Sequence, residues 1–256
     1  MNNVPSTALA GGVLVLALML SACGDGAAPE PTSTDAPAAT AGAERVDGPA
    51  SCGALSLVEG ASISGDALGK CLADYLAFAG SGAFTMRSET VSSRTVWRMG
   101  DEYEAYAALD SGVRMTTTGG RSWVDFGDTG WVEADPSTPG MEVGFGIIKA
   151  WREATGPEVT RRMIAAAPEW KVGAWRDMAL PDGTSRHLAG VTATAPFHWG
   201  GATIDAMTLW MDEPGRIILQ LATAGAAGFT ADTTTHYAQW GGEVAIPDPA
   251  SSASVR

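Results

Sequence analysis

The sequence has few basic residues, and no Asp, Glu, Lys, Arg or His occurs before Asp25. Lysine and arginine number 16 against 29 aspartate and glutamate residues, so the formal net charge is -13. The negative net charge repels the phosphate groups of nucleic acids and of anionic lipids. It argues against nucleic acid as a partner and against membrane binding through a basic patch. Any attachment to a membrane must therefore be covalent or hydrophobic.

The common signatures of catalysis are also missing. No stretch reads GxSxG, SxxK, CxxC or HExxH. The three histidines are His187, His198 and His236, and none has a carboxylate or a second histidine at ligand spacing in the sequence. The sequence therefore predicts no catalytic residue, no metal and no other cofactor, and it favours a protein that is not an enzyme.

An apolar run is present at the N-terminus, from Ala8 to Leu20. It is too short to span a hydrocarbon core of about 30 Å, but it suits the central region of a signal peptide. It ends in Leu20-Ser21-Ala22-Cys23, which resembles the lipobox of bacterial lipoproteins. The resemblance implies a signal peptide over residues 1–22, lipid attached to Cys23, and a location on the outer face of the cytoplasmic membrane. The alternative is an ordinary secretory signal with an incidental cysteine.

One feature departs from that pattern, because residues 1–7 contain no lysine or arginine, so the true start codon is open. Residues 23–50 combine the cysteine with a linker rich in alanine, proline and threonine that has too few large apolar side chains to form a core. A flexible chain of this length spans roughly 30 Å. We expect a folded domain over residues 51–250 and a flexible tail over 251–256.

Two cysteines remain beside Cys23. Cys52 and Cys71 form an even set, and an exported chain would place them in an oxidising compartment. The sequence therefore predicts one disulfide bond between them. It would close a loop of about twenty residues and contribute on the order of 3 kcal/mol. The alternative is a pair of buried free thiols.

Apolar periodicity predicts the elements of the domain. Residues 66–78 have helical spacing, with Asp66 as the N-cap and Gly80 as the stop signal. From Gly82 the period becomes two, with Phe84 and Met86 on one face, and turn signals at short intervals indicate an antiparallel meander. Two helices, over 142–155 and from Pro157 to Ile164, interrupt it. Later strands are expected over residues 170–180, 187–197, 207–212, 216–222 and 230–239.

Three stretches resemble a known family. They are Gly130-Trp131-Val132, Leu209-Trp210-Met211-Asp212 with Pro214-Gly215-Arg216, and Tyr237-Ala238-Gln239-Trp240-Gly241 leading to Val244-Ala245-Ile246-Pro247. In this order they are similar to the LolA-like lipoproteins of actinobacteria, the LppX/LprG-like family, over roughly residues 82–249. The resemblance implies an α+β fold: a strongly curved antiparallel half-barrel with helices covering its concave face. It also implies an apolar cavity that holds acyl chains, but no individual ligand-binding residue.

The nine tryptophans and ten methionines suit such a cavity, because large rings and thioethers adapt to flexible acyl chains. The candidates on inward-facing positions are Trp97, Met99, Phe145, Ile148, Trp151, Met163, Met207 and Met211. Core packing is the alternative for each of them. We therefore expect a lipid-anchored binding protein for a lipid or glycolipid, with an unknown envelope partner. The rival hypothesis is a scaffold or regulatory lipoprotein with a filled core.

Overall fold

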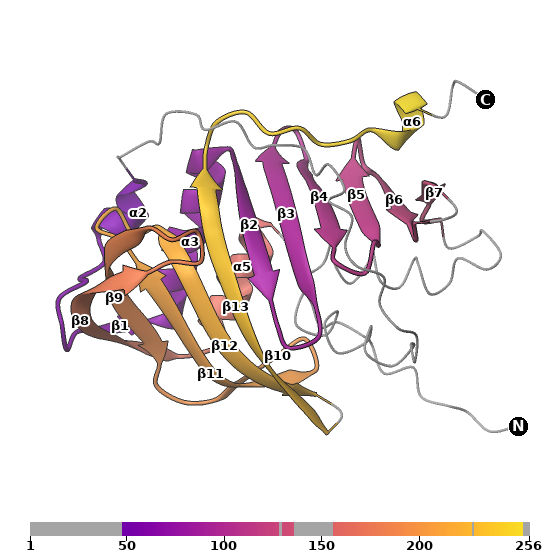
Figure 1. The fold of residues 1–256 in the computed structure, drawn as a ribbon. Coiled ribbons are helices and arrows are strands. Elements are labelled where there is room, and N and C mark those ends of the chain that lie inside the picture. Colours follow the sequence, from indigo (N-terminus) through magenta and orange to yellow (C-terminus); the bar gives the residue numbers. More distant parts are fainter. Residues whose placement is uncertain (1–47, 128–129, 136–155, 227, 253–256) are drawn as a thin grey trace, which may run out of the picture.

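A computed structural model describes residues 48–127, 130–135, 156–226 and 228–252. These parts form mainly one open, curved, antiparallel sheet of 13 strands, accompanied by few helices (Figure 1). This composition is consistent with the α+β class expected from the sequence. The strand order is β1-β8-β9-β11-β12-β13-β2-β3-β4-β5-β6-β7, and β10 pairs with β11 outside this path. Strands β13 and β2, from opposite ends of the domain, therefore meet at the centre.

The strands follow the predicted meander, and each turn signal lies between two of them. Their bounds are β1 Ser62–Ser64, β2 Ser81–Arg87, β3 Ser92–Met99, β4 Tyr103–Leu109, β5 Arg114–Thr118, β6 Arg121–Asp125, β7 Val132–Glu133, β8 Glu169–Ala179, β9 Ser185–Ala193, β10 Phe197–Trp199, β11 Ala202–Met211, β12 Ile217–Ala226 and β13 Phe229–Trp240. The short first strand, β1, was not predicted, because three residues carry no readable period.

Four helices lie in the described parts of the chain: α2 Ala50–Gly53, α3 Gly65–Ala79, α5 Pro157–Ala165 and α6 Pro249–Ser252. The expectation of Asp66 as the N-cap of α3 is wrong. The Ser64 hydroxyl accepts a hydrogen bond from the Ala67 amide and is the cap, while Asp66 lies in the first turn. Gly80 ends the helix as predicted, in the left-handed conformation with φ of 72°.

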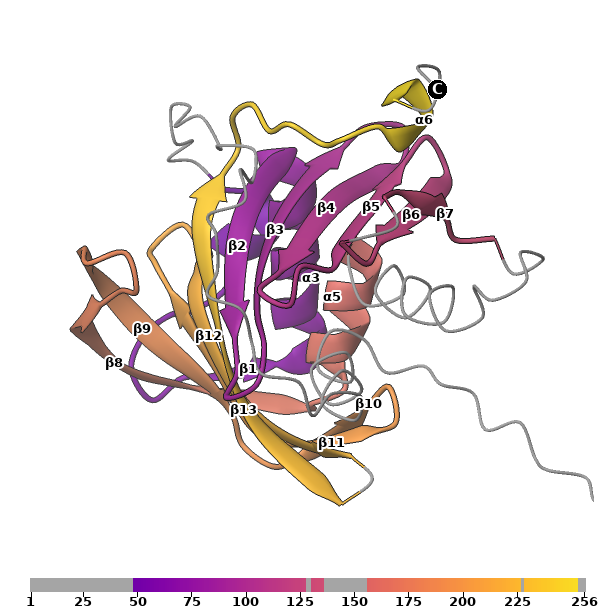
Figure 2. The same ribbon diagram turned by 45° about the vertical axis from the view of Figure 1, so that its right-hand side comes forward.

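Helices α3 and α5 pack against each other and lie on the same side of the sheet (Figure 2). We call the sheet face that shares their hydrophobic core the inner face. Their contact depends on two glycines of α3. A Cβ on Gly65 would lie 2.0 Å from the Ala167 carbonyl oxygen, and one on Gly69 would lie 2.5 Å from the Arg161 carbonyl oxygen. Only glycine allows so close an approach of the two backbones.

The main core lies between these helices and the inner face. Leu68 and Leu72 of α3 and Ile164 of α5 are fully buried within it, together with Leu209 and Met211 of β11. Register explains why the strand residues meet there, because antiparallel partners point to the same face and their side chains alternate along each strand.

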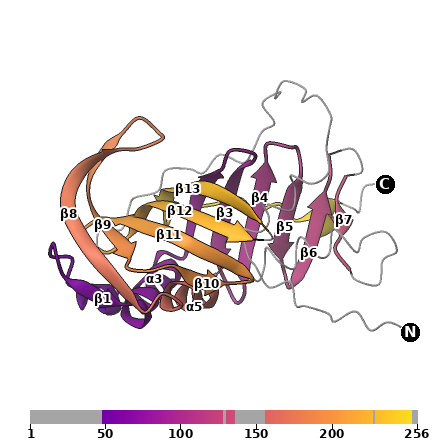
Figure 3. The ribbon, with the colours of Figure 1, turned by 90° about the horizontal axis from the view of Figure 1, so that it is seen from below.

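Two segments pack on the opposite, outer face. After β13 the chain crosses β2, β3 and β4, and Val244 packs on Val96 and Tyr106 (Figure 1). The Thr116 hydroxyl donates a hydrogen bond to the Pro247 carbonyl oxygen. At the other side of the sheet, the strongly curved β8–β9 hairpin brings Leu180 into a second cluster on the outer face (Figure 3).

Several predicted features lie outside the described residues: the signal peptide over 1–22, the lipid attachment at Cys23, nearly all of the linker and the helix over 142–155. The helix expected from Pro157 to Ile164 corresponds to α5. At the C-terminal end, α6 continues to Ser252.

Candidate ligand-binding face

Five of the eight residues predicted to line a cavity lie in the described chain, and all five belong to the main core or pack against it. Trp97 is 1% exposed, Met207 is 1% exposed and Met211 is completely buried. Met99 and Met163 lie at the margin of the core and are half-buried. The structure thus gathers residues from β3, β11 and α5 on one side of the sheet.

The other three predicted residues, Phe145, Ile148 and Trp151, lie outside the described residues. The five that are described differ in their surroundings. No solvent-sized space touches Trp97, Met207 or Met211, so their packing is that of core residues. Only Met99 and Met163 retain accessible surface. A role in binding a ligand stays a prediction for all eight.

Aromatic rings connect α3 with the inner face. Trp240 of β13 packs edge-on against Tyr75 of α3, with ring centroids 5.3 Å apart, and edge-on against Trp97, at 6.1 Å. Trp97 in turn stacks with Tyr103 of β4, at 6.4 Å. The Trp240 indole N–H donates a hydrogen bond to the Ile217 carbonyl oxygen, which fixes the central ring of the group.

A second aromatic contact joins the two central strands. Phe84 of β2 and Tyr237 of β13 are direct register partners, and their ring centroids are 5.5 Å apart. Tyr237 also stacks on Trp240, at 5.4 Å with an interplanar angle of 17°. Both Phe84 and Tyr237 are half-buried, although they stand in the middle of the inner face.

The surroundings of Tyr237 weaken the solvation of its side chain. Loss of solvation raises the pKa of the phenol to about 12. Tyr237 is thus intermediate between a surface residue and a core residue. It retains some accessible surface, whereas Met211 has none. Sequence reasoning placed Phe84 on the correct face and drew no conclusion about Tyr237 beyond the family resemblance.

The inner face of the three central strands is free of charge. Its positions, read from the register, are Thr233, Thr235 and Tyr237 on β13, Gly82, Phe84 and Met86 on β2, and Ser93, Thr95 and Trp97 on β3. The outer face of β2 and β3 carries Arg87, Arg94 and Arg98 instead. This sorting follows from the alternation of side chains along a strand. A molecule on these three strands would meet apolar groups and hydroxyls, and the amide of Gln220 on β12 lies beside Thr235 on the same face.

The β8–β9 hairpin makes a distinct group on the outer face. Arg176 lies over the Trp210 ring, 4.2 Å from its centroid. His236 of β13, which is buried, has its Nε2 3.8 Å from Asp182 in the hairpin turn. Burial lowers the pKa of His236, and the nearby carboxylate opposes this shift only in part. His236 is therefore uncharged at neutral pH and has a packing role.

The remaining histidines are exposed to solvent. His187 lies 2.9 Å from an Asp177 carboxylate oxygen and stacks on Trp175, with ring centroids 5.7 Å apart. His198 lies 3.1 Å from the Thr203 hydroxyl. Sequence spacing did not reveal the two histidine–aspartate pairs, because their partners come from separate strands or turns. Across the described ranges, no three His, Cys, Asp or Glu residues are placed to bind a metal ion.

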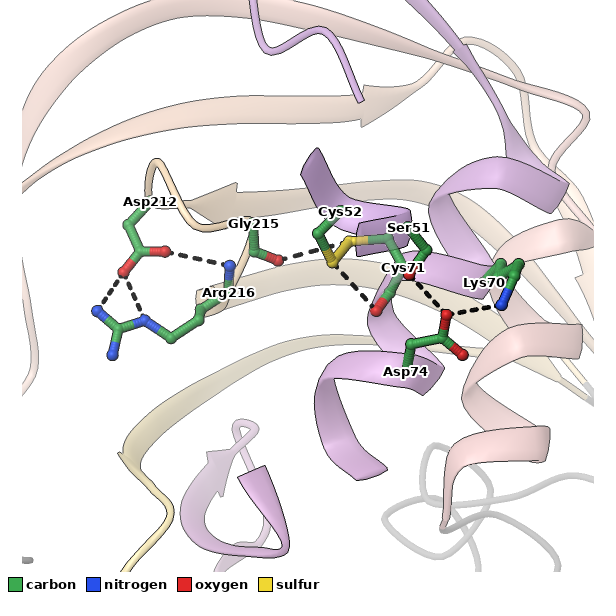
Figure 4. The surroundings of a disulfide bond; sticks show 8 residues. All are labelled: Ser51, Cys52, Lys70, Cys71, Asp74, Asp212, Gly215 and Arg216. Carbon is green, nitrogen blue, oxygen red and sulfur yellow. Dashed lines mark hydrogen bonds and ion pairs between the residues drawn. A yellow bond between two sulfur atoms is a disulfide. The ribbon is translucent and has the colours of Figure 1, made fainter. Parts of the chain in front are cut away.

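The predicted disulfide is confirmed, because Cys52 and Cys71 are bonded and join α2 to α3 (Figure 4). The turn between β11 and β12 packs directly on it. A Cβ on Gly215 would lie 3.0 Å from the Cys52 Cβ, and the φ of 86° at Gly215 also favours glycine. In the same turn, Arg216 and Asp212 form an ion pair in which both side chains are largely buried. The disulfide therefore holds α2, α3 and this turn together.

None of the helices in the described residues is both long and apolar enough to cross a membrane.

Comparison with known proteins adds little to this description. No protein-family model matches the chain, and no curated protein matches it. Its structure is similar to that of a DUF1329 family protein from Desulfovibrio piger ATCC 29098, with 11% sequence identity, an alignment that covers 73% of this chain and 96% of that chain, and a TM-score of 0.23. A TM-score of this size carries no argument about fold or function.

Proposed function

We propose that this chain is a lipid-anchored extracytoplasmic binding protein of the LolA-like type. In this proposal the curved sheet is a half-barrel, the helices cover its concave face, and an acyl chain or another apolar ligand lies between them. Cys23 carries the anchor and places the domain on the outer face of the cytoplasmic membrane. Transport of a lipid or lipoprotein through the envelope is the process that such a protein would serve.

The observation that carries the proposal is the pair Phe84 and Tyr237. A filled core seals the middle of its sheet, as it does at Met207 and Leu209. Here two aromatic rings that contact each other in the middle of the sheet keep accessible surface, while the side chain of one of them, Tyr237, is desolvated. Sheltered apolar surface with few polar groups is typical of small-molecule binding sites.

The absence of charge on the inner face of the central strands supports the same proposal. An acyl chain gains about 0.8 kcal/mol for each methylene that leaves water, and a charged wall would cancel this gain. Hydroxyls of Thr95 and Thr235 are compatible with such a chain, because a threonine methyl group can face the ligand.

Enlarging one residue tests the proposal against a filled core. Ser93 is half-buried on the inner face of β3. It lies two positions from Thr95, which is the register partner of Phe84. If a ligand occupies this region, Ser93→Phe leaves the thermal stability of the protein nearly unchanged and lowers the amount of lipid that co-purifies with it. In a filled core the added ring costs typically about 1–3 kcal/mol.

The neighbouring residue supplies the control. Arg94→Phe places the same ring on the outer face, because consecutive strand residues point to opposite sides. Lipid extracted from each purified variant is identified by mass spectrometry. The binding proposal fails if Ser93→Phe is destabilised and the wild-type protein carries no lipid.

The anchor has its own test. Cys23→Ser removes the thiol that would accept diacylglycerol, so metabolic labelling with a radioactive fatty acid should be lost in this variant and kept in wild type. Labelling that persists in Cys23→Ser would refute the anchor without touching the binding proposal.

A scaffold with no ligand is the second candidate function. It is favoured by the complete packing of Trp97, Met207 and Met211, three of the residues expected to line a cavity. The Ser93→Phe experiment separates the two functions, because a scaffold responds in stability and a binding protein responds in ligand content.

A further inference from the structure

Two turns at one end of the sheet carry aromatic side chains with accessible surface. Phe229 begins β13, directly after the β12–β13 turn, and is 67% exposed. Trp199 ends β10, directly before the β10–β11 turn, and is half-buried. Thr203 of β11 pairs with Gly225 of β12, so the two turns lie on neighbouring strands at the same end of the sheet (Figure 2). We call these two turns, with Trp199 and Phe229, the hairpin tips.

The hairpin tips stand clear of the rest of the described chain. β13 pairs with β2 only from Thr234 onward, so residues 229–233 extend past this pairing. Gly201 and Gly228 occupy the turns in the left-handed conformation, with φ of 82° and 85°. A Cβ on either glycine would meet nothing within 4 Å. Open space therefore surrounds both turns.

The tips are uncharged, although the protein is strongly acidic. Neither residues 188–204, which contain the first turn, nor residues 217–231, which contain the second, include an Asp, Glu, Lys or Arg. Asp205 and Asp232 are the first carboxylates after these two stretches. Asp232 lies three residues beyond Phe229, or about 10 Å along the strand. The second tip thus offers about this length of uncharged chain before a carboxylate is reached.

This combination suits the boundary between water and a lipid bilayer. A single exposed phenylalanine is common on protein surfaces and needs no explanation, but here two aromatic residues stand on adjacent uncharged tips. Tryptophan is enriched at the level of the lipid headgroups, and phenylalanine is typical of segments that enter the boundary between headgroups and acyl chains to a depth of roughly 5–10 Å. The uncharged length of the second tip matches that depth.

The chain enters the domain at the other end of these strands. A Cβ on Gly48 would lie 2.7 Å from the carbonyl oxygen of Pro214, in the β11–β12 turn. The distance from that turn to the tips is set by the ten residues of β11, which extend over roughly 33 Å. Residues 23–47 can reach at most about 80–90 Å. A chain held at Cys23 is therefore long enough for the tips to face the membrane.

We propose that the hairpin tips insert into the headgroup region of a lipid bilayer and give the domain a second contact with the membrane, in addition to the lipid at Cys23. The partner is a lipid surface without net negative charge, because Asp205, Asp232 and the net charge of -13 repel anionic headgroups. The contact fixes which end of the domain faces the membrane. It requires no ligand between the sheet and the helices, so it goes beyond the proposed binding function.

Position-specific fluorescence tests this contact on the full-length chain. Cys23→Ser leaves no free thiol, because Cys52 and Cys71 are bonded to each other. Thr230→Cys then carries an environment-sensitive label beside Phe229, at an exposed position. An N-terminal histidine tag holds the protein on phosphatidylcholine vesicles that contain a nickel-chelating lipid, so the test does not depend on the anchor. The label should shift its emission to shorter wavelength and be quenched by a quencher attached to the acyl chains.

Two variants serve as controls. Val58→Cys carries the same label at a residue that is also 67% exposed, but in the loop between α2 and β1, and this label should keep the emission that it has in water. Phe229→Asp in the Thr230→Cys protein should abolish the shift and leave the thermal stability unchanged, because the ring is largely in solvent. Vesicles rich in phosphatidylglycerol should give a smaller shift than phosphatidylcholine, because their headgroups are anionic.

The outcomes separate this inference from the proposed function. An unshifted label at position 230 of the tethered protein overturns the membrane contact and leaves the anchor and the ligand-binding function standing. A shift of equal size at position 58, or one that persists in Phe229→Asp, overturns it as well. A shift that grows with protein concentration in the absence of vesicles would identify a second copy of this chain as the partner of the tips and would refute the lipid surface.

Discussion

Two regions of the inner face are packed in opposite ways. Around β9 and β11, Val191, Leu209 and Met211 have no accessible surface, and residues of α3 and α5 belong to the same core. At the centre, where β13 meets β2, Phe84 and Tyr237 are only half-buried. One sheet thus presents a sealed region and a sheltered but incompletely filled region side by side.

The difference shows how one sheet can supply both stability and a place to bind. Closely packed interiors lose free energy when even one methylene is removed, so a sealed region tolerates little change. A region with accessible apolar surface lacks some of those contacts and can gain them from a ligand. The predictions below ask whether the two regions respond to substitution as differently as their packing implies.

The largest effect is expected in the sealed region. Trp170 of β8 is completely buried, and its indole N–H donates a hydrogen bond to the Ile164 carbonyl oxygen of α5. Trp170→Ala should lower the free energy of unfolding by about 3–5 kcal/mol, as measured by chemical denaturation. A loss below 1 kcal/mol would mean that this region is not the stable part of the domain.

The disulfide should contribute nearly as much. Replacing Cys52 and Cys71 together by alanine opens a loop that spans 19 residues and should cost on the order of 3 kcal/mol. Wild-type protein measured in a reducing agent is the matched control and should lose the same amount. If the reduced protein is as stable as the oxidised one, the turn at Gly215 and the buried ion pair hold this corner without the bond.

Phe84 gives the corresponding measurement in the half-buried region. Phe84→Ala should cost clearly less than the roughly 3–5 kcal/mol that removal of a fully buried ring costs, because part of the ring has no packing partner. If Phe84→Ala loses the full amount of about 3–5 kcal/mol of unfolding free energy in a lipid-free sample, the centre of the sheet is packed like the sealed region. The contrast between the two regions would then be wrong.

The remaining effect is absent at neutral pH and appears only at high pH. The pKa of Tyr237 is about 12 in the folded protein and about 10 in an unfolded chain, so the unfolded state loses its proton first. Stability is therefore unaffected below pH 10 and falls between pH 10 and pH 12, by at most about 1.4 kcal/mol for each pH unit. Tyr237→Phe should show a smaller fall over this interval, and identical slopes for the two proteins would mean that the phenol is not desolvated.

Much of the fold was predictable from local pattern. The period-two alternation gave the faces of β2 and β3 correctly, and the glycine at position 80 gave the end of α3. The N-cap was misplaced because Ser64 and Asp66 are both good capping residues, and only the backbone decides which hydroxyl or carboxylate reaches a free amide. The order of strands is non-local and could not be read from the sequence.

The candidate site was less accessible to sequence reasoning. Alternation places Phe84 on the inner face, but whether it is sealed depends on what lies opposite, which is a property of the folded chain. The pairing of Phe84 with Tyr237 joins residues about 150 positions apart. Trp97 and Met99 lie two positions apart on one strand and face the same way, yet only the first is completely packed.

The position of the disulfide has a mechanical consequence. Cys52 lies in α2 and is bonded to Cys71 of α3 inside the core. Tension applied through the N-terminal chain reaches this covalent bond within the single turn of α2. The load then falls on α3 as a whole, which is wedged between α5, the sheet and the turn at Gly215. A domain pulled from this end resists peeling and must yield cooperatively, as one unit.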